Sequence, residues 1–223
     1  MILNYNPYKF HLNDNECKIL THFARKSRLE FSINKKVSRF KARKIFYDLI
    51  NKNIIKIEKN CDLFTKNKNF AFQDKVIFKS NFMRFYFYFL KPYEKLIFSN
   101  KDEAYQKILS EFNNYLSYIF EMVACEFCER YFNIYGVQSI WGKDYECDIY
   151  YNDFDFTLLG EVKFNGKKMC LNSYSKLQNK AKLLGLEPNK FIFFSKNLYS
   201  KKLQNLNDNR LILASLKDFE KFK

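Results

Sequence analysis

Two apolar, strand-like stretches carry charged side chains where such strands normally hold valine, isoleucine or threonine. Asp148 lies in the stretch ECDIYY, and Glu161 and Lys163 lie in FTLLGEVKF. Side chains two residues apart share one face of a strand, so Glu161 and Lys163 point the same way, as do Glu146 and Asp148. If the strands pair through the NDFD turn, Asp148 and Glu161 converge, and two adjacent carboxylates are costly unless a cation lies between them.

The chemistry that such a site offers is metal-assisted hydrolysis. Mg²⁺ prefers carboxylate and water oxygens, and Mn²⁺ can take its place. A metal held by Asp148 and Glu161 would bind a scissile phosphate, lower the pKa of a bound water and stabilise the charge that develops during phosphodiester hydrolysis. Lys163 would orient that water or neutralise the phosphate, and Glu121 on a preceding helix would hold a metal-bound water. The structural alternative is a same-face salt bridge between Glu161 and Lys163 at a sheet edge, worth less than about 1 kcal/mol.

Periodicity predicts the elements that would position these residues. Apolar side chains recur at intervals of three and four from residue 109 to 131, which predicts a long helix. Strands are predicted at 137–141, 146–151, 156–164, 190–195 and 210–215. A helix at 173–184 is ended by Gly185 with Pro188 beyond, and a terminal helix closes the chain. This order predicts an α+β or α/β fold with a central mixed sheet flanked by helices.

The arrangement resembles the PD-(D/E)XK, or restriction-endonuclease-like, nuclease superfamily over residues 109–215. The resemblance rests on Asp148, the triplet Glu161-Val162-Lys163 and Glu121 on the preceding helix. It implies that Asp148 and Glu161 bind Mg²⁺, that Lys163 assists hydrolysis and that Glu121 is a further ligand. Cys147 stands where the name of the motif has Pro.

The resemblance also implies polar support around the site. The helix after the triplet often supplies such residues, and Gln178 and Lys182 are the candidates here. Glu146, close to Asp148, is a third candidate. Cutting both strands of duplex DNA would need two such sites and therefore a homodimer.

The N-terminal part has the element order of a winged helix-turn-helix. Asn13 caps a predicted helix with Glu16 three positions on, a second helix opens near Ser38, and two short strand-like runs follow within residues 53–67. Three basic residues lie on one side of the second helix: Lys41, Arg43 and Lys44. In a winged helix this helix enters a DNA major groove and the hairpin touches the phosphates. The alternative is that these cations form the solvated face of an amphipathic helix.

The net charge of +15 indicates a polyanionic partner, although abundant lysine and asparagine can also reflect an AT-rich genome. Residues 1–75 carry 17 Lys and Arg against 7 Asp and Glu, a net charge of +10, whereas the rest of the chain carries +5. Such an asymmetry is typical of a nucleic-acid-binding module, so DNA is the predicted partner.

An aromatic-rich segment, residues 68–108, connects the predicted winged helix at 1–67 with the nuclease-like domain at 109–223. Its stretch SNFMRFYFYFLKP is predicted to be helical up to Pro92, and its rings are expected to pack the two halves together. This stretch, with SYIFEMVACEF, IWGKDYECDIYY and LLGEVKF, is similar to the C-terminal part of the archaeal-type ATPase family. That family joins a P-loop ATPase to a winged helix and a nuclease-like domain. Because this chain has no GxxxxGK(S/T) phosphate loop, a separate ATPase is a predicted partner.

Two alternatives to a Mg²⁺-dependent DNA nuclease stay open. The first is a DNA-binding regulator whose nuclease-like domain is inactive, and the second is a subunit that docks a separate ATPase.

The cysteines and the apolar segments indicate an intracellular protein. Cys125 and Cys128 form a CxxC inside a predicted helix with no second pair at zinc spacing, so we expect buried thiols instead of a metal site. The sequence shows neither a signal peptide nor a membrane span, which predicts a cytoplasmic location and no membrane partner.

Overall fold

The first helix, α1 (Asp14–Arg25), begins at the capping box that the sequence predicts. In the computed structural model, Asn13 Oδ1 accepts hydrogen bonds from the backbone N–H groups of Asn15 and Glu16, both at 3.0 Å. Glu16 Oε2 accepts in return from the Asn13 N–H at 2.7 Å. The structure describes residues 12–35, 37–60, 73–142 and 145–222.

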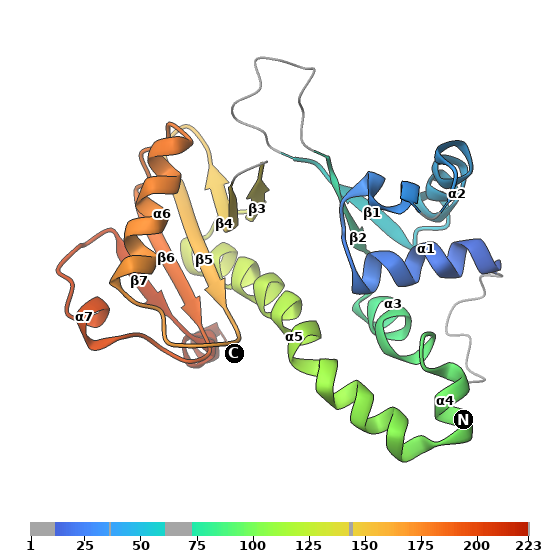
Figure 1. Ribbon diagram of the computed structural model, residues 1–223. Coiled ribbons are helices and arrows are strands. Elements are labelled where there is room, and N and C mark those ends of the chain that lie inside the picture. Colours follow the sequence, from blue (N-terminus) through green and yellow to red (C-terminus); the bar gives the residue numbers. More distant parts are fainter. Residues whose placement is uncertain (1–11, 36, 61–72, 143–144, 223) are drawn as a thin grey trace. The chain divides into compact units, whose positions relative to one another are not determined.

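The described chain forms two units, unit 1 with residues 12–60 and 73–111 and unit 2 with residues 112–222 (Figure 1). The elements of unit 1 are α1, the 3-10 helix η2 (Glu30–Lys35), α2 (Arg39–Asn51), strands β1 (Ile55–Glu58) and β2 (Lys75–Phe78), α3 (Asn81–Phe85), the π-helical turn η4 (Tyr86–Leu90), α4 (Glu94–Ser99) and the start of α5 (Lys101–Phe132). The strands β1 and β2 are antiparallel, and Leu29 forms an isolated bridge with Lys75 of β2. The first strand of the predicted hairpin is therefore present, whereas residues 61–67 of that prediction lie outside the described residues.

The aromatic segment belongs to the core of unit 1. Phe87 and Phe89 are fully buried, and Phe87 stacks on Phe78 of β2 with 6.3 Å between ring centroids. Phe23 of α1 meets Phe46 of α2 edge to face at 6.2 Å. Most of the predicted connector is thus part of the N-terminal unit, because its aromatic turn η4 packs against α1.

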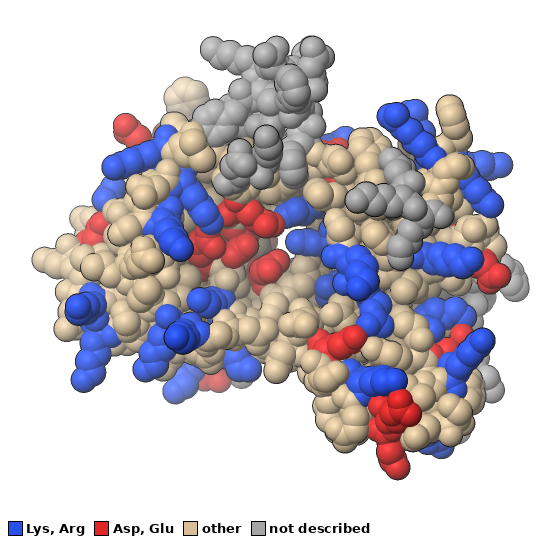
Figure 2. Space-filling model, viewed as in Figure 1, with Lys and Arg blue, Asp and Glu red and all other residues tan. Residues whose placement is uncertain are grey.

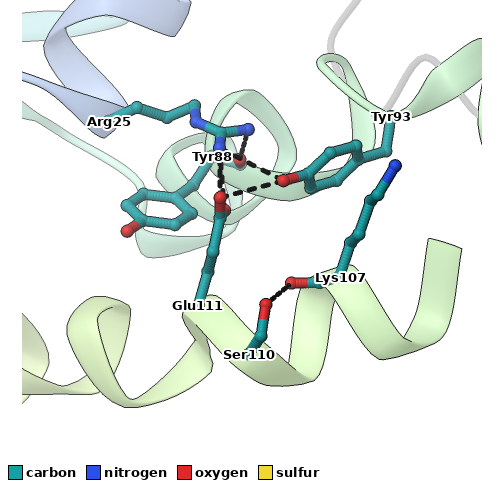
Figure 3. Close-up of polar contacts among 6 residues, drawn as sticks. All are labelled: Arg25, Tyr88, Tyr93, Lys107, Ser110 and Glu111. Carbon is teal, nitrogen blue, oxygen red and sulfur yellow. Dashed lines mark hydrogen bonds and ion pairs between the residues drawn. The ribbon is translucent and has the colours of Figure 1, made fainter. Parts of the chain in front are cut away.

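Arg25 at the end of α1 anchors the first part of α5 within unit 1 (Figure 3). Its Nη2 donates to both carboxylate oxygens of Glu111, at 2.6 and 2.8 Å, and its Nη1 donates to the Tyr88 carbonyl oxygen at 3.2 Å. The Tyr93 hydroxyl donates to Glu111 at 2.9 Å, and the guanidinium lies over the rings of Tyr88 and Tyr93. Every charge in this network has a partner, which is the condition for a half-buried ion pair to stabilise a fold.

We expect Arg25→Met to lower the free energy of unfolding of unit 1 by about 2 kcal/mol, because it leaves the half-buried Glu111 carboxylate without its cation. Lys107→Met is the matched control. Its partner Glu103 and Lys107 itself are both exposed, so the loss should stay below about 0.5 kcal/mol. Urea unfolding curves of the two variants check this, and equal losses would contradict it.

Unit 2 is built on one mixed sheet. Its elements are the remainder of α5, β3 (Gln138–Trp141), β4 (Glu146–Asn152), β5 (Thr157–Lys163), α6 (Leu171–Leu183), β6 (Lys190–Ser195), α7 (Lys201–Gln204), β7 (Leu211–Ala214), α8 (Leu216–Phe219) and the 3-10 turn η5 (Glu220–Phe222). The strand order is β3-β4-β5-β6-β7, with β3, β4 and β5 antiparallel and β5, β6 and β7 parallel. The five predicted strands and the helices predicted at 109–131 and 173–184 are confirmed, with boundaries shifted by one or two residues except that α5 begins earlier, and α8 is the predicted terminal helix.

The sheet of unit 2 lies between two helical layers (Figure 1). One face packs against α6, through residues that include Leu159, Leu177 and Phe193, and the other packs against α5, through residues that include Phe127 and Phe194. This mixed α/β architecture agrees with the predicted fold class. No helix among the described residues is long and apolar enough to cross a bilayer.

Candidate metal centre and nucleic-acid interface

An irregularity in β4 lies at the predicted acidic site. In this antiparallel pair Ile140 of β3 lies opposite Cys147 of β4, and Gln138 lies opposite Tyr150. Between these two pairs β4 has two residues and β3 has one. Asp148 lies within this bulge. Bulges break the regular alternation of side chains and re-aim the residues that they contain, and they are frequent beside active sites.

Asp148 is held by its side chain and by its backbone. Its Oδ2 accepts a hydrogen bond from the Val162 N–H of β5 at 2.9 Å. Its carbonyl oxygen accepts a weak hydrogen bond from the Cys125 thiol of α5, with 3.6 Å between sulfur and oxygen. The carboxylate is therefore fixed relative to β5, and one side of α5 lies against the bulge.

Glu161 lies opposite Asp148. β4 and β5 pair up to Ile149 and Gly160, and continuing that register by one step places Asp148 across from Glu161. The Glu161 side chain is only 24% exposed. Burial, followed by the charge of Asp148, raises the pKa of Glu161 to about 7. The structure thus brings the two predicted carboxylates together.

The cation beside them is Lys180 of α6, which was not among the residues predicted from the sequence. Its Nζ forms an ion pair with Glu161 Oε1 and donates to the Glu146 carbonyl oxygen at 2.5 Å. Burial acts to lower the pKa of Lys180, but the hydrogen bond and charge of Glu161 outweigh it and leave the pKa raised. Lys180 lies three residues after Leu177 and four before Leu184, which are both buried against the sheet. This helical spacing could have predicted that Lys180 faces the sheet.

Lys163 lies two residues beyond Glu161 on β5. Leu159 belongs to the core layer under α6, so alternation puts Glu161 and Lys163 on the same side of the sheet. Lys163 is half-buried, and in the part of the chain that the structure describes its ammonium has no hydrogen bond or ion pair. A lysine ammonium in this position is suited to binding a phosphate oxygen.

Glu121 lies one turn before Cys125, on the side of α5 that meets the bulge. It is half-buried. No three Asp, Glu, His or Cys side chains among the described residues are grouped so that they could hold a metal, so Glu121 does not complete a cluster with Asp148 and Glu161. The candidate centre is therefore a pair of carboxylates.

The three residues predicted as support differ in position. Glu146 contacts the site through its carbonyl oxygen. Gln178 instead lines a separate pocket with Tyr174 and Asp208, and Lys182 is exposed on α6. Only Glu146 is placed beside the carboxylate pair by the described contacts.

The cysteines among the described residues are free thiols, and of the predicted CxxC pair Cys128 is buried whereas Cys125 is half-buried. Burial raises the pKa of both Cys128 and Cys147 to about 12, which keeps these thiols protonated and inert. Cys170 is exposed, and hydrogen bonds from Ser173 lower its pKa.

The predicted DNA-contacting residues of unit 1 all lie on the exposed side of α2. Lys41, Arg43 and Lys44 are exposed, while Ala42, Ile45, Phe46 and Leu49 are buried. The helix is thus amphipathic with a basic outer face. Both the DNA-binding interpretation and the solvated-face interpretation require this geometry.

Several acidic side chains of unit 2 lie close together. Figure 2 shows Asp and Glu side chains together over the strands of this unit, with Lys and Arg around them. The charge of Asp148 adds to the burial that raises the pKa of Glu161, and Lys180 opposes this rise through its ion pair with Glu161. The donor set, two carboxylates with an ammonium in the position of a counter-ion, fits Mg²⁺, which proteins commonly bind through one or two carboxylates and water.

Residues 86–176 match the family DUF234, described as archaea bacterial proteins of unknown function. The matched region runs from η4 to the first turns of α6 and includes Glu121, Asp148, Glu161 and Lys163. No curated protein and no solved structure matches the chain.

Proposed function

We propose that the chain is a Mg²⁺-dependent DNA nuclease with an N-terminal DNA-binding module. One observation carries this proposal: Glu161 is held half-buried opposite Asp148, with Lys180 as the cation that the pair requires. A sheet that only needed stability would do better with apolar residues there, because buried ion pairs are rarely more stabilising than well-packed apolar side chains. Such an arrangement is typical of a functional site.

Asp148 and Glu161 would hold the metal, Mg²⁺ or Mn²⁺. When bound, the metal would polarise the scissile phosphate and supply an activated water. The Val162 N–H keeps the Asp148 carboxylate in place. Lys163 binds a phosphate oxygen and stabilises the charge that develops on it, and Lys180 holds Glu161 in position.

The likeness of unit 2 to a PD-(D/E)XK nuclease rests on the element order, on the paired carboxylates and on the lysine two residues after Glu161. The element order of unit 1 likewise supports a winged helix. It runs α1, the Leu29 bridge, η2, the basic α2 and then the two strands β1 and β2. The match to a family of archaeal and bacterial proteins agrees with the likeness to the archaeal-type ATPase family. A separate ATPase partner and a homodimer remain predictions.

The proposal is tested by incubating supercoiled plasmid with the full chain in Mg²⁺, in Mn²⁺ and in EDTA. We expect nicked or linear plasmid in both metals and none in EDTA. Intact plasmid in all three would instead favour a DNA-binding or partner-binding protein without cleavage.

Metal binding should depend on pH because of Glu161. Its carboxyl, with a pKa of about 7, is mostly protonated at pH 6 and must lose the proton to bind a cation. We expect the affinity for Mn²⁺ to rise by about fivefold from pH 6 to 7 and by about tenfold from pH 6 to 8, where it levels off. Calorimetry in two buffers of different ionisation enthalpy measures the proton release, and an affinity independent of pH would contradict this assignment.

A further inference from the structure

A pocket of about 300 Å³ opens in unit 1 beside the N-terminal half of α2. Its apolar floor includes Ile19 and Phe46, and polar and aromatic side chains form its rim: Glu30, Phe31, Arg39, Arg43 and Tyr47. A pocket of this size holds a small planar group with few polar contacts. The residue types on the rim restrict what that group can be.

Two aromatic rings on the rim are each paired with an arginine. The Arg39 guanidinium carbon lies 5.9 Å from the centre of the Phe31 ring, and that of Arg43 lies 5.8 Å from the centre of the Tyr47 ring. Phe31 is 45% exposed and Tyr47 is 52% exposed. Partly exposed aromatic rings beside guanidinium groups form the combination that stacks on nucleobases and binds the adjoining phosphates.

A carboxylate completes the rim. Glu30 is half-buried, and burial followed by the charge of Asp74 raises its pKa. Within the described residues its carboxylate forms no hydrogen bond and no ion pair. In nucleic-acid complexes a glutamate typically accepts a hydrogen bond from the exocyclic amino group of cytosine.

The surface next to the pocket is basic. Between residues 38 and 47, α2 and its cap expose four cations and no acidic side chain: Arg39, Lys41, Arg43 and Lys44. Figure 2 shows Lys and Arg side chains projecting around α2. Phe40, which is 90% exposed, adds a further ring to this face. The charge is complementary to a phosphate backbone, and the exposed rings are complementary to bases.

We propose that this pocket receives an unpaired base of single-stranded DNA, with cytosine favoured over thymine. In duplex DNA the base faces are stacked and only their edges are accessible, so rings at a pocket rim can contact a base face only where the strand is unpaired. Phe31 and Tyr47 stack on the base, Glu30 accepts from its amino group, and the cations of α2 bind the flanking phosphates. Base binding at this pocket of unit 1 does not depend on cleavage at Asp148 and Glu161, which lie in unit 2.

The test is fluorescence anisotropy with labelled (dC)₁₂, (dT)₁₂ and a mixed-sequence duplex, using the full chain in EDTA so that no cleavage can occur. We expect tighter binding of (dC)₁₂ than of (dT)₁₂ or of the duplex at equal salt. Phe31→Ala and Tyr47→Ala should each weaken single-strand binding by about tenfold and leave duplex binding nearly unchanged. Glu30→Gln should remove the preference for (dC)₁₂ over (dT)₁₂.

Phe98→Ala is the matched control, because Phe98 is an exposed ring of unit 1 that lies on α4 outside the pocket. Phe31→Leu serves as a second variant that keeps the apolar volume and removes the stacking surface. Circular dichroism confirms that each variant is folded. Equal losses in Phe98→Ala and Tyr47→Ala, or duplex binding as tight as single-strand binding, would overturn the proposal.

Discussion

Asp148→Asn and Glu161→Gln should each reduce plasmid nicking by about 10³-fold or more, while the protein stays folded. These changes remove the negative charge and keep the shape, so the metal loses a ligand and the several kcal/mol of charge stabilisation that it supplies. The asparagine can still accept the hydrogen bond from the Val162 N–H through its amide oxygen, so β4 and β5 should stay in register. Initial rates of nicking in Mg²⁺ and in Mn²⁺ measure the loss.

Asp155→Asn is the matched control for these variants. Asp155 is an exposed carboxylate in the turn between the same two strands, and its side chain forms no hydrogen bond or ion pair in the described structure. Its replacement should change the rate less than about twofold. Wild-type rates in Asp148→Asn or Glu161→Gln would show that the two carboxylates have no part in catalysis.

Lys163→Met should lower kcat by about 10²-fold and leave the affinity for Mn²⁺ nearly unchanged. Lys163 is half-buried, has no partner for its ammonium in the described structure and lies on the Glu161 side of β5. We therefore assign it to the phosphate and not to the metal. Methionine keeps the length and the apolar stem, so the sheet should not be disturbed.

Lys168→Met separates this effect from a general loss of positive charge. Lys168 is exposed in the segment that follows β5, and its removal should weaken DNA binding slightly without changing kcat. If both lysine variants lost activity through KM alone, Lys163 would be one more surface cation that attracts DNA.

Much of unit 2 could be predicted because its signals are local. Alternation and apolar runs located all five strands, and Gly185, with a positive φ of 63°, ends α6 as expected. The capping box at Asn13 located the start of α1 for the same reason. The convergence of Asp148 and Glu161 followed from a single assumption, that the two strands pair through the NDFD turn, and this pairing is present.

Features that depend on tertiary contacts could not be predicted. The bulge at Asp148 arises from the pairing of β4 with β3, and the role of Lys180 depends on how α6 lies across the sheet. The requirement for glycine at position 160 also depends on a tertiary contact, because an added Cβ would lie 2.6 Å from the Ile192 carbonyl oxygen of β6. The assignment of the aromatic segment to unit 1 also depends on packing between distant residues such as Phe78 and Phe87.

The claim that Asp148 and Glu161 form a metal centre is tested most directly by titrating Mn²⁺ into the metal-free chain at pH 7.5, with calorimetry as the readout. We expect saturable binding of about one ion per chain in the wild type and in Asp155→Asn, with at least about tenfold weaker binding in Glu161→Gln. Absence of binding at millimolar Mn²⁺, or equal binding by wild type and Glu161→Gln, would contradict it. Glu161 and Lys180 would then be only an ion pair that joins α6 to the sheet.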